Sequence, residues 1–239
     1  DINGGDSAHK LAILASLAFG YEIDLNDVST EGIENVSIVD IRYGLEMGYI
    51  MKLLAIGHNT DGKISLRVHP SFIPNENPLA KVSGSFNAVS IYGDAVGQTI
   101  HYGRGAGMMP TASAVVADII DVALGNSGNS FRHTHLKPRT ETLIEKDDNL
   151  VSRFYIRLQV KDKPGVIAEV TRILADNGIN ISGMLQHETS DPDDIPIVIT
   201  THTTIQNRIT RALKSFEELD AVCAKPVSIK IVDMPEDKD

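Results

Sequence analysis

Apolar and polar positions follow two rhythms in the first half of the chain, which predicts a mixture of helices and strands there. Apolar residues recur at helical spacing over residues 6–19, and a second helix is expected over 37–47 with Ser37 as its N-cap. The period then becomes that of strands on both sides of Asp61 and Gly62, a hairpin signal. The elements expected after residue 48 are strands over 49–57, 63–72, 87–92 and 98–102, a helical turn opened by Asn77 and Pro78, and a helix over 110–124.

The second half has a clearer pattern, in which strand and helix periods alternate in one continuous run. The expected order is a strand over 153–160, a tight turn over 162–165, a helix over 166–177, a strand over 179–186, an acidic turn over 190–194, a strand over 195–201, a helix over 203–219 and a last strand within 222–232. This βαββαβ order is the ferredoxin-like topology.

A change in composition separates the two halves. Residues 125–130 are Gly, Asn and Ser, and the charged, proline-containing run after them reaches Asp148, so residues 125–149 are expected to form a linker. The predicted class is α+β. A mixed β-sheet domain with flanking helices over 1–124 precedes a ferredoxin-like module over 150–233 and a charged tail over 234–239.

Composition and charge exclude several classes of protein. The 239 residues include 22 Lys and Arg against 32 Asp and Glu, so the net charge of -10 argues against a nucleic-acid partner. Hydrophobic residues make up 42%, as in a globular chain, but no apolar run approaches the roughly 20 residues of a membrane helix. No secretion signal is visible, and the lone Cys223, expected in the core, excludes a disulfide framework within one chain. A cytoplasmic location fits these features.

The start of the chain carries the first candidate chemistry. Asp6 and Lys10 are four residues apart, so both project from one face of the expected helix, and Asp1 lies in the loop before it. Such a pair can hold a charged substrate, and the lysine can donate a proton to an oxygen that is becoming an alkoxide. The alternative is a surface salt bridge worth roughly a few tenths of a kcal/mol. The Asn3-Gly4-Gly5 lead-in is costly unless the backbone turns sharply or approaches a ligand.

A glycine-rich turn at residues 103–107 is the second candidate. It follows a strand and precedes a helix, so the backbone N–H groups near Gly105, Ala106 and Gly107 can face a ligand at the helix N-terminus. The dinucleotide fingerprint Gly-x-Gly-x-x-Gly is not matched, because Met108 occupies its last position. A purely structural strand-to-helix turn remains the alternative.

The histidines do not predict a metal site. His133 and His135 lie in the expected linker with no acidic or cysteine partner at metal-site spacing. The other six are scattered, and each is expected at the surface or at a strand end; they are His9, His58, His69, His101, His187 and His202.

The turn over residues 162–166 is the most specific local signal. Pro164 and Gly165 set a tight strand-to-helix turn, and the helix that follows offers free N–H groups to a small anion such as a carboxylate. Asn180, at the start of the next strand, can close over the same ligand. The alternative is a structural turn with Asn180 as an ordinary strand-start residue.

Two families resemble this chain in these segments. The run Asp-Lys-Pro-Gly-Val at 162–166, the run Asn-Gly-Ile-Asn-Ile at 177–181 and the βαββαβ order resemble an ACT domain, an amino-acid-sensing module that pairs side by side with another. Residues 1–11 and 103–115 resemble the catalytic region of homoserine dehydrogenase, and residues 195–202 are similar to the ACT portion of the long bacterial enzymes of that family.

The resemblance implies an NAD- or NADP-dependent enzyme that interconverts aspartate 4-semialdehyde and homoserine, on the route to threonine, methionine and isoleucine. By position, Lys10 matches the catalytic lysine, Asp6 the carboxylate beside it and Asp1 a further acid of the substrate pocket. The turn at Gly105, Ala106 and Gly107 matches the segment that closes against the nicotinamide side of the cofactor. The implied effector site, for an amino acid expected to be threonine, comprises Asp162, Gly165, Val166 and Asn180 in a homo-oligomer.

One departure from the family pattern limits what this chain is expected to do alone. Enzymes of the family begin with a dinucleotide-binding domain, which the chain lacks, and a family glutamate expected shortly before Asp1 is also outside it. With Asp1 in place of a methionine, the sequence looks like a piece of a longer protein, not expected to turn over by itself. The rival hypothesis is a non-catalytic amino-acid-binding regulator with a dimerising first half, but Asp6, Lys10 and the glycine turn favour the enzyme.

Overall fold

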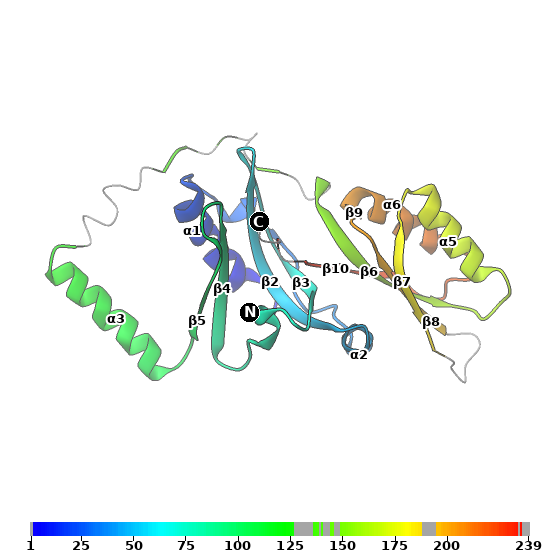
Figure 1. The fold of residues 1–239 in the computed structure, drawn as a ribbon, viewed down its shortest axis with the longest axis horizontal. Coiled ribbons are helices and arrows are strands. Elements are labelled where there is room, and N and C mark those ends of the chain that lie inside the picture. Colours follow the sequence, from blue (N-terminus) through cyan, green and yellow to red (C-terminus); the bar gives the residue numbers. More distant parts are fainter. Residues whose placement is uncertain are drawn as a thin grey trace.

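The computed structural model describes residues 2–126, 136–138, 140, 144–145, 149–187, 195–233 and 235. Figure 1 shows an elongated molecule in which the two halves of the chain lie side by side. The first half contains α1 (Gly5–Phe19), η1 (Leu25–Asp27), β1 (Ser29–Thr30), α2 (Ile38–Glu46), β2 (Tyr49–Thr60), β3 (Lys63–Pro74), η2 (Pro78–Lys81), β4 (Phe86–Gly93), β5 (Gly97–Arg104) and α3 (Met108–Ala123). The second half contains β6 (Val151–Val160), α5 (Val166–Asp176), β7 (Ile181–Gln186), β8 (Ile195–Thr201), β9 (Thr204–Ile205), α6 (Gln206–Glu217) and β10 (Val227–Ile231).

One mixed sheet runs through both halves, in the order β1-β3-β10-β6-β8-β7, with β2 paired to β3 and β9 to β6. The strands β1 and β10 share one edge of β3. Both run parallel to it, with Ser29 opposite Arg67 and Lys230 opposite Ser71. The last strand of the second half is therefore hydrogen-bonded to the first half.

The second half has the predicted ferredoxin-like fold. Its strands lie in the order β10-β6-β8-β7, and α5 and α6 cover one face of them. The helices close a core of fully buried side chains, among them Phe154, Leu158, Val170 and Phe216. The burial of one strand face and one stripe of each helix explains why the periodicity was a reliable guide here.

In the first half, α1 packs on the β2–β3 hairpin. Its small residues Ala8, Ala12 and Ala15 allow the helix to approach Leu66 and Val68 of β3 closely. The hairpin turns as predicted at Asp61 and Gly62, where φ is 52° and 80°. Ser37 caps α2 and Asn77 caps η2, also as predicted.

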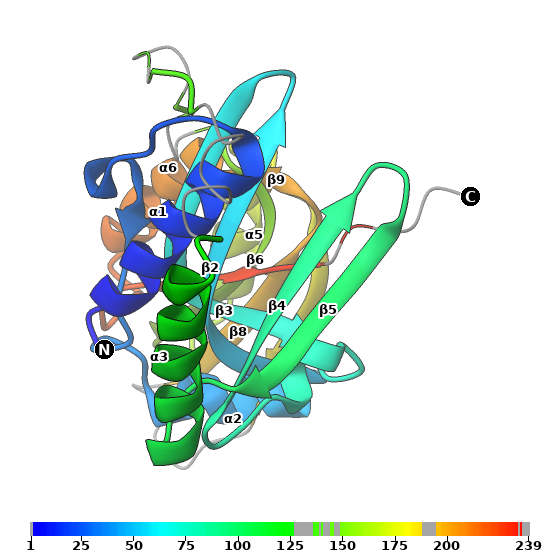
Figure 2. The ribbon, with the colours of Figure 1, turned by 90° about the vertical axis from the view of Figure 1, so that its left-hand side faces the viewer.

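The glycine turn, α3 and the β4–β5 hairpin stand apart from this core. β4 and β5 form a separate two-stranded sheet (Figure 2), and α3 projects away from the molecule (Figure 1). None of the residues of α3 is buried. The helices that flank the mixed sheet on its first-half side are α1 and α2.

Most of the expected linker and tail, and the whole of the acidic turn expected over 190–194, lie outside the described residues. Described linker residues contact the first half at two places: Lys137 forms a β-bridge with Tyr21, and Ile144 forms one with Ile64, where Glu145 also donates its N–H to the Ile64 carbonyl oxygen at 2.8 Å. The domain limits proposed from the sequence stay a prediction. No helix in the described part of the chain is long and apolar enough to cross a membrane.

Two expectations for single residues were wrong. His69, expected at the surface or a strand end, is 2% exposed in the middle of β3, because that strand is covered on both faces. Its ring Nδ1 lies 2.7 Å from the Ser71 hydroxyl, and burial, the largest cause, lowers its pKa to about 3. Cys223, expected in the core, is exposed, because Val222 makes the bridge to Val160 while Cys223 follows it outside the strands.

Helix α2 lies close to β3 at Gly44. A Cβ atom at this position would lie 2.1 Å from Phe72 Cε1, and the Phe72 ring is itself fully buried against Tyr155. Glycine in a helix interior is otherwise unfavourable, so its role here is to let the helix lie against the ring.

Gly44→Ala should therefore lower the free energy of unfolding by about 1–3 kcal/mol, as overpacking does, despite the better helix propensity of alanine. Urea unfolding followed by circular dichroism measures the change. Leu45→Ala, on the exposed side of the same helix, is the control and should change stability by less than about 0.5 kcal/mol. A Gly44→Ala variant as stable as the control would show that the ring yields easily.

Candidate active site

The predicted pair forms at the start of α1. Lys10 Nζ donates a hydrogen bond to Asp6 Oδ2 at 2.6 Å, and the two side chains are 63% and 53% exposed. The helix begins after Gly4, whose backbone is left-handed at φ 82°. A Cβ atom at Gly4 would lie 3.0 Å from Thr30 Cγ2, so the costly glycine lead-in is explained by a close approach to β1.

The electrostatics of this pair favour the charged carboxylate. The hydrogen bond from Lys10 is the largest cause that lowers the pKa of Asp6. At neutral pH the site thus presents an ammonium and a carboxylate to solvent. The ammonium can donate to an anionic oxygen, and the carboxylate can accept from a cationic group. Asp1, the third predicted member of the pocket, lies outside the described residues.

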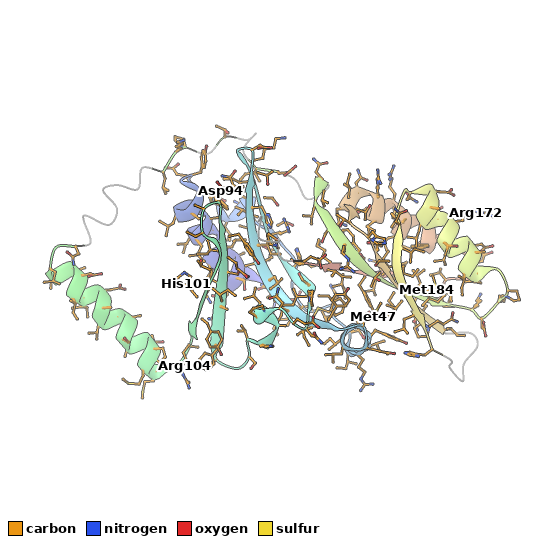
Figure 3. The ribbon with its side chains drawn as sticks, in the orientation of Figure 1. Met47, Asp94, His101, Arg104, Arg172 and Met184 are labelled. Atoms are coloured by element: carbon orange, nitrogen blue, oxygen red, sulfur yellow. The ribbon has the colours of Figure 1, made fainter. Side chains whose placement is uncertain are left out.

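The glycine turn begins where β5 ends at Arg104, which Figure 3 labels beside the start of α3. Gly105 donates its N–H to the Ser85 carbonyl oxygen at 3.0 Å, and a Cβ atom there would overlap the Asn87 side chain. Gly107 has φ 127° and precedes α3 with no side-chain cap, so N–H groups at this helix end are open to a ligand. Among the described residues, no hydrogen bond or ion pair joins this turn to Asp6 or Lys10.

The third predicted site surrounds the turn before α5. Gly165 is left-handed at φ 96° and begins the helix without a side-chain cap, while Val166 is buried. Asp162 is exposed, and Asn180 is exposed immediately before β7. An open hollow of about 700 Å³ adjoins the turn; Val166 lines it, whereas Asp162, Gly165 and Asn180 do not. Its lining residues are Lys161, Lys163, Pro164, Val166, Glu169, Glu218, Leu219, Asp220 and Ala221.

A buried polar cluster that the sequence did not reveal lies between the two halves. Asp40 on α2 is 1% exposed and accepts hydrogen bonds from Arg157 Nε at 2.6 Å, Arg157 Nη2 at 3.0 Å and the Tyr155 hydroxyl at 2.9 Å. Burial is the largest cause that raises the pKa of Tyr155, and the hydrogen bond to Asp40 is the largest that raises the pKa of Arg157. The only sequence signal was an acidic residue in the first turn of an amphipathic helix; its partners are 115 and 117 positions away.

A metal centre finds no support in the described part of the chain. No group of three or more His, Cys, Asp or Glu residues there lies close enough to hold a metal ion. His133 and His135 are outside the described residues.

Comparisons with known proteins agree with the two halves of the fold. Residues 1–120 match the family described as homoserine dehydrogenase, and residues 154–221 match the ACT domain. The chain is 41% identical over 237 residues to a homoserine dehydrogenase of Pseudomonas aeruginosa, covering 97% of this chain and 55% of the relative. It is 42% identical to a homoserine dehydrogenase of Helicobacter pylori, covering 97% of this chain and 54% of that one.

The similarity extends to solved structures. A crystal structure of a homoserine dehydrogenase from Thiobacillus denitrificans matches with a TM-score of 0.87 and 42% identity, over 98% of this chain and 54% of the other. The fold and the family matches thus define a two-part chain, a region of the homoserine dehydrogenase type joined to an ACT domain. The chain belongs to the homoserine dehydrogenase family, and it spans about half the length of the curated relatives that it matches.

The link between Asp6 and Lys10 can be tested on this chain directly. Lys10→Met removes the hydrogen bond that stabilises the Asp6 carboxylate, so the pKa of Asp6 should rise toward its ordinary value. A carboxyl-detected NMR titration measures it. Lys63→Met, which removes an exposed lysine from the start of β3, should leave the Asp6 titration unchanged. An unchanged Asp6 pKa in Lys10→Met would mean that the two groups do not pair in solution.

Proposed function

We propose that the protein containing this chain interconverts L-homoserine and L-aspartate 4-semialdehyde with NAD or NADP, in a biosynthetic route to threonine, methionine and isoleucine. The observation that carries the proposal is the Lys10–Asp6 pair, open to solvent at the start of α1 in a chain of the homoserine dehydrogenase family. The relatives' names supply the reaction class, and the pair supplies groups suited to it.

The residues of the pair have complementary tasks in this reaction. When bound, the nicotinamide supplies or accepts the hydride. Reduction of the aldehyde leaves negative charge on its oxygen, and the Lys10 ammonium can neutralise that charge and donate the proton. The Asp6 carboxylate keeps the ammonium oriented and can attract the substrate's own ammonium group. Asp1 would add a second carboxylate to the pocket.

Among the described residues, those of the glycine turn fit one edge of a nicotinamide cofactor. Gly105, Ala106 and Gly107 allow close backbone approach at an uncapped helix N-terminus, which suits a neighbouring cofactor. No Gly-x-Gly-x-x-Gly run occurs in the sequence, so most of the cofactor contacts would come from another domain.

In the complete gene product, Lys10→Met should lower kcat for homoserine oxidation by about 10²–10⁴-fold, the usual contribution of positioned proton transfer. The Kd for NADPH should change little, because the lysine serves the reacting oxygen. Steady-state kinetics and calorimetric titration measure the two quantities. Lys63→Met serves as the control with ordinary turnover, and near wild-type kcat in Lys10→Met would remove Lys10 from the mechanism.

We further propose that the ACT domain binds a feedback effector, with threonine as the first candidate. The left-handed Gly165 and the uncapped start of α5 offer N–H groups to an amino-acid carboxylate, together with the favourable end of the helix dipole. Asn180 has an exposed side chain next to β7 and would contact the polar atoms of the ligand from a paired module.

Asn180→Ala should weaken inhibition by threonine roughly ten- to a hundredfold, because a ligand polar group would lose its partner at a cost of about 1–3 kcal/mol. The inhibition constant for homoserine oxidation and the Kd from calorimetry should rise together. Asn177→Ala is the matched control, since Asn177 Nδ2 donates within its own helix to the Ile173 carbonyl oxygen. If no amino acid binds the wild-type protein, the sensing role is wrong.

The protein is proposed to work as a homo-oligomer in the cytoplasm. The β4–β5 hairpin supports the homo-oligomer, because it exposes large apolar side chains on a ribbon that stands apart from the core; they are Val89, Ile91, Ile100 and Tyr102. The Asp6–Lys10 pair and the glycine turn favour the enzyme over a purely regulatory protein, which would need neither.

A further inference from the structure

Helix α2 belongs to the first half of the molecule and also contacts the ACT domain. Its Asp40 is bonded to β6 of the ACT domain, and its Gly44 lies against Phe72 of β3. Near its C-terminal end, Glu46 Oε2 lies 2.9 Å from His187 Nε2, at the end of β7. Figure 1 shows the helix at the junction between the two halves.

The Asp40 contact is the strongest of these links. Both oxygens of the buried carboxylate are used, and all three donors belong to β6. The Glu46–His187 contact is by contrast about half exposed on both sides, where solvent weakens it. Separating α2 from β6 would leave a buried carboxylate and a half-buried guanidinium without partners, a cost that favours keeping the two elements together.

The Asp40 cluster is connected along β6 to the turn at residues 162–166, which we call the ACT ligand turn after its proposed role. Tyr155 and Arg157 stand on the same face of β6, and the strand continues to Val160, two residues before the turn at 162–166. The Lys161 N–H, at the end of that strand, donates to the Ala221 carbonyl oxygen at 2.9 Å and ties the turn to the α6–β10 loop. A ligand that reorders this turn thus acts on the strand that holds Asp40.

Toward the active-site pair, the connection runs through the segment before α2. Ile33 donates its N–H to the Ile2 carbonyl oxygen at 2.9 Å. A Cβ atom at Gly32 would lie 2.5 Å from that same oxygen and 2.6 Å from Asn3 Cα, so the two segments are in close contact. Asn3 Oδ1 in turn accepts the Gly5 N–H at 3.0 Å, in the first turn of the helix that carries Asp6 and Lys10.

We propose that the buried Asp40–Arg157 pair, with Tyr155, couples the ACT ligand turn to the start of α1, and that α2 moves with β6 to shift residues 2–5 beneath Lys10. The residues of the pair are positioning residues, because they act on Lys10 through Ile33 and Ile2. The proposal rests on the proposed function for its two end points, but the mechanical link between them can be tested by itself.

The mechanical link is tested by hydrogen exchange on this chain. Arg157→Met should speed amide exchange at Ile33 by about tenfold or more, because the hydrogen bond to Ile2 loses its support when α2 is released. The matched control is Arg172→Met on the outer side of α5, well separated from α2 (Figure 3), which should leave Ile33 as in the wild type. If exchange rises only within α2 and β6 while Ile33 keeps its wild-type rate, the link is refuted.

A second variant, in which apolar side chains replace the polar cluster, keeps the link testable if Arg157→Met does not fold. Asp40→Leu, Tyr155→Phe and Arg157→Met combined replace all three polar groups at once, and such replacements of buried ion pairs are often neutral for stability. The combined variant should retain cooperative unfolding and still show faster exchange at Ile33. A stable variant with wild-type exchange there would also refute the link.

The regulatory consequence is tested in the complete gene product. The combined variant should bind threonine with a Kd within about threefold of wild type, yet its inhibition constant should rise by about tenfold or more. Equal inhibition of variant and wild type would overturn the coupling, as would a wild-type enzyme that binds amino acids without any change in turnover. A wild-type protein that neither oxidises homoserine nor binds an amino acid would instead refute the proposed function, and the exchange experiment would still decide the link.

Discussion

The parallel pairing of β10 with β3 is the constraint on which the arrangement of the molecule depends. It is short, with two registered residue pairs, Lys230 opposite Ser71 and Ile231 opposite Phe72, and one further bond from the Val232 N–H to the Phe72 carbonyl oxygen. Because β10 is also fully paired to β6 on its other side, these few bonds extend the first-half sheet into the ACT domain. A flexible tether between independent domains would not require α2 to fit both sides of the junction, whereas a shared sheet does.

The shared sheet also limits how the ACT domain could pair with a second copy in the proposed homo-oligomer. The edge formed by β10 is occupied by β3, so among the described strands of the ACT domain β7 forms the edge left for pairing. The burial of β7 alternates between partly buried and exposed residues, as expected of an edge strand with one face on a core. An effector bound between paired modules would therefore lie on the side of the domain away from the first half, and its effect would have to cross the sheet to reach Lys10.

The sequence predicted what local periodicity and turn chemistry control, and it missed what depends on distant partners. The βαββαβ order, the Asp61-Gly62 hairpin and the Ser37 cap follow from short patterns, and the structure contains all three. The His69 ring is buried because a second layer covers β3. The Asp40 cluster depends on a strand more than 100 positions away along the chain, so neither feature has a local signal in the sequence. The Lys10–Asp6 bond was predictable because four residues of helix fix it, whereas the relation of the glycine turn to this pair has no local signal and stays a prediction.

How strongly the Lys10–Asp6 pair could stabilise a charged oxygen depends on whether another surface shields it from water. An exposed ammonium in water gains little from its carboxylate and would stabilise an alkoxide weakly, because solvent screens both interactions. Ile13, Leu14 and Leu17 follow Lys10 at helical spacing and expose 63%, 46% and 51% of their surfaces on the same side of α1. An apolar stripe of this kind beside a charged pair is suited to contact with another surface. In the proposed function, such a contact would exclude water from Lys10 and strengthen its field at the substrate oxygen, so the cover that buries the stripe would also make the ion pair suited to catalysis.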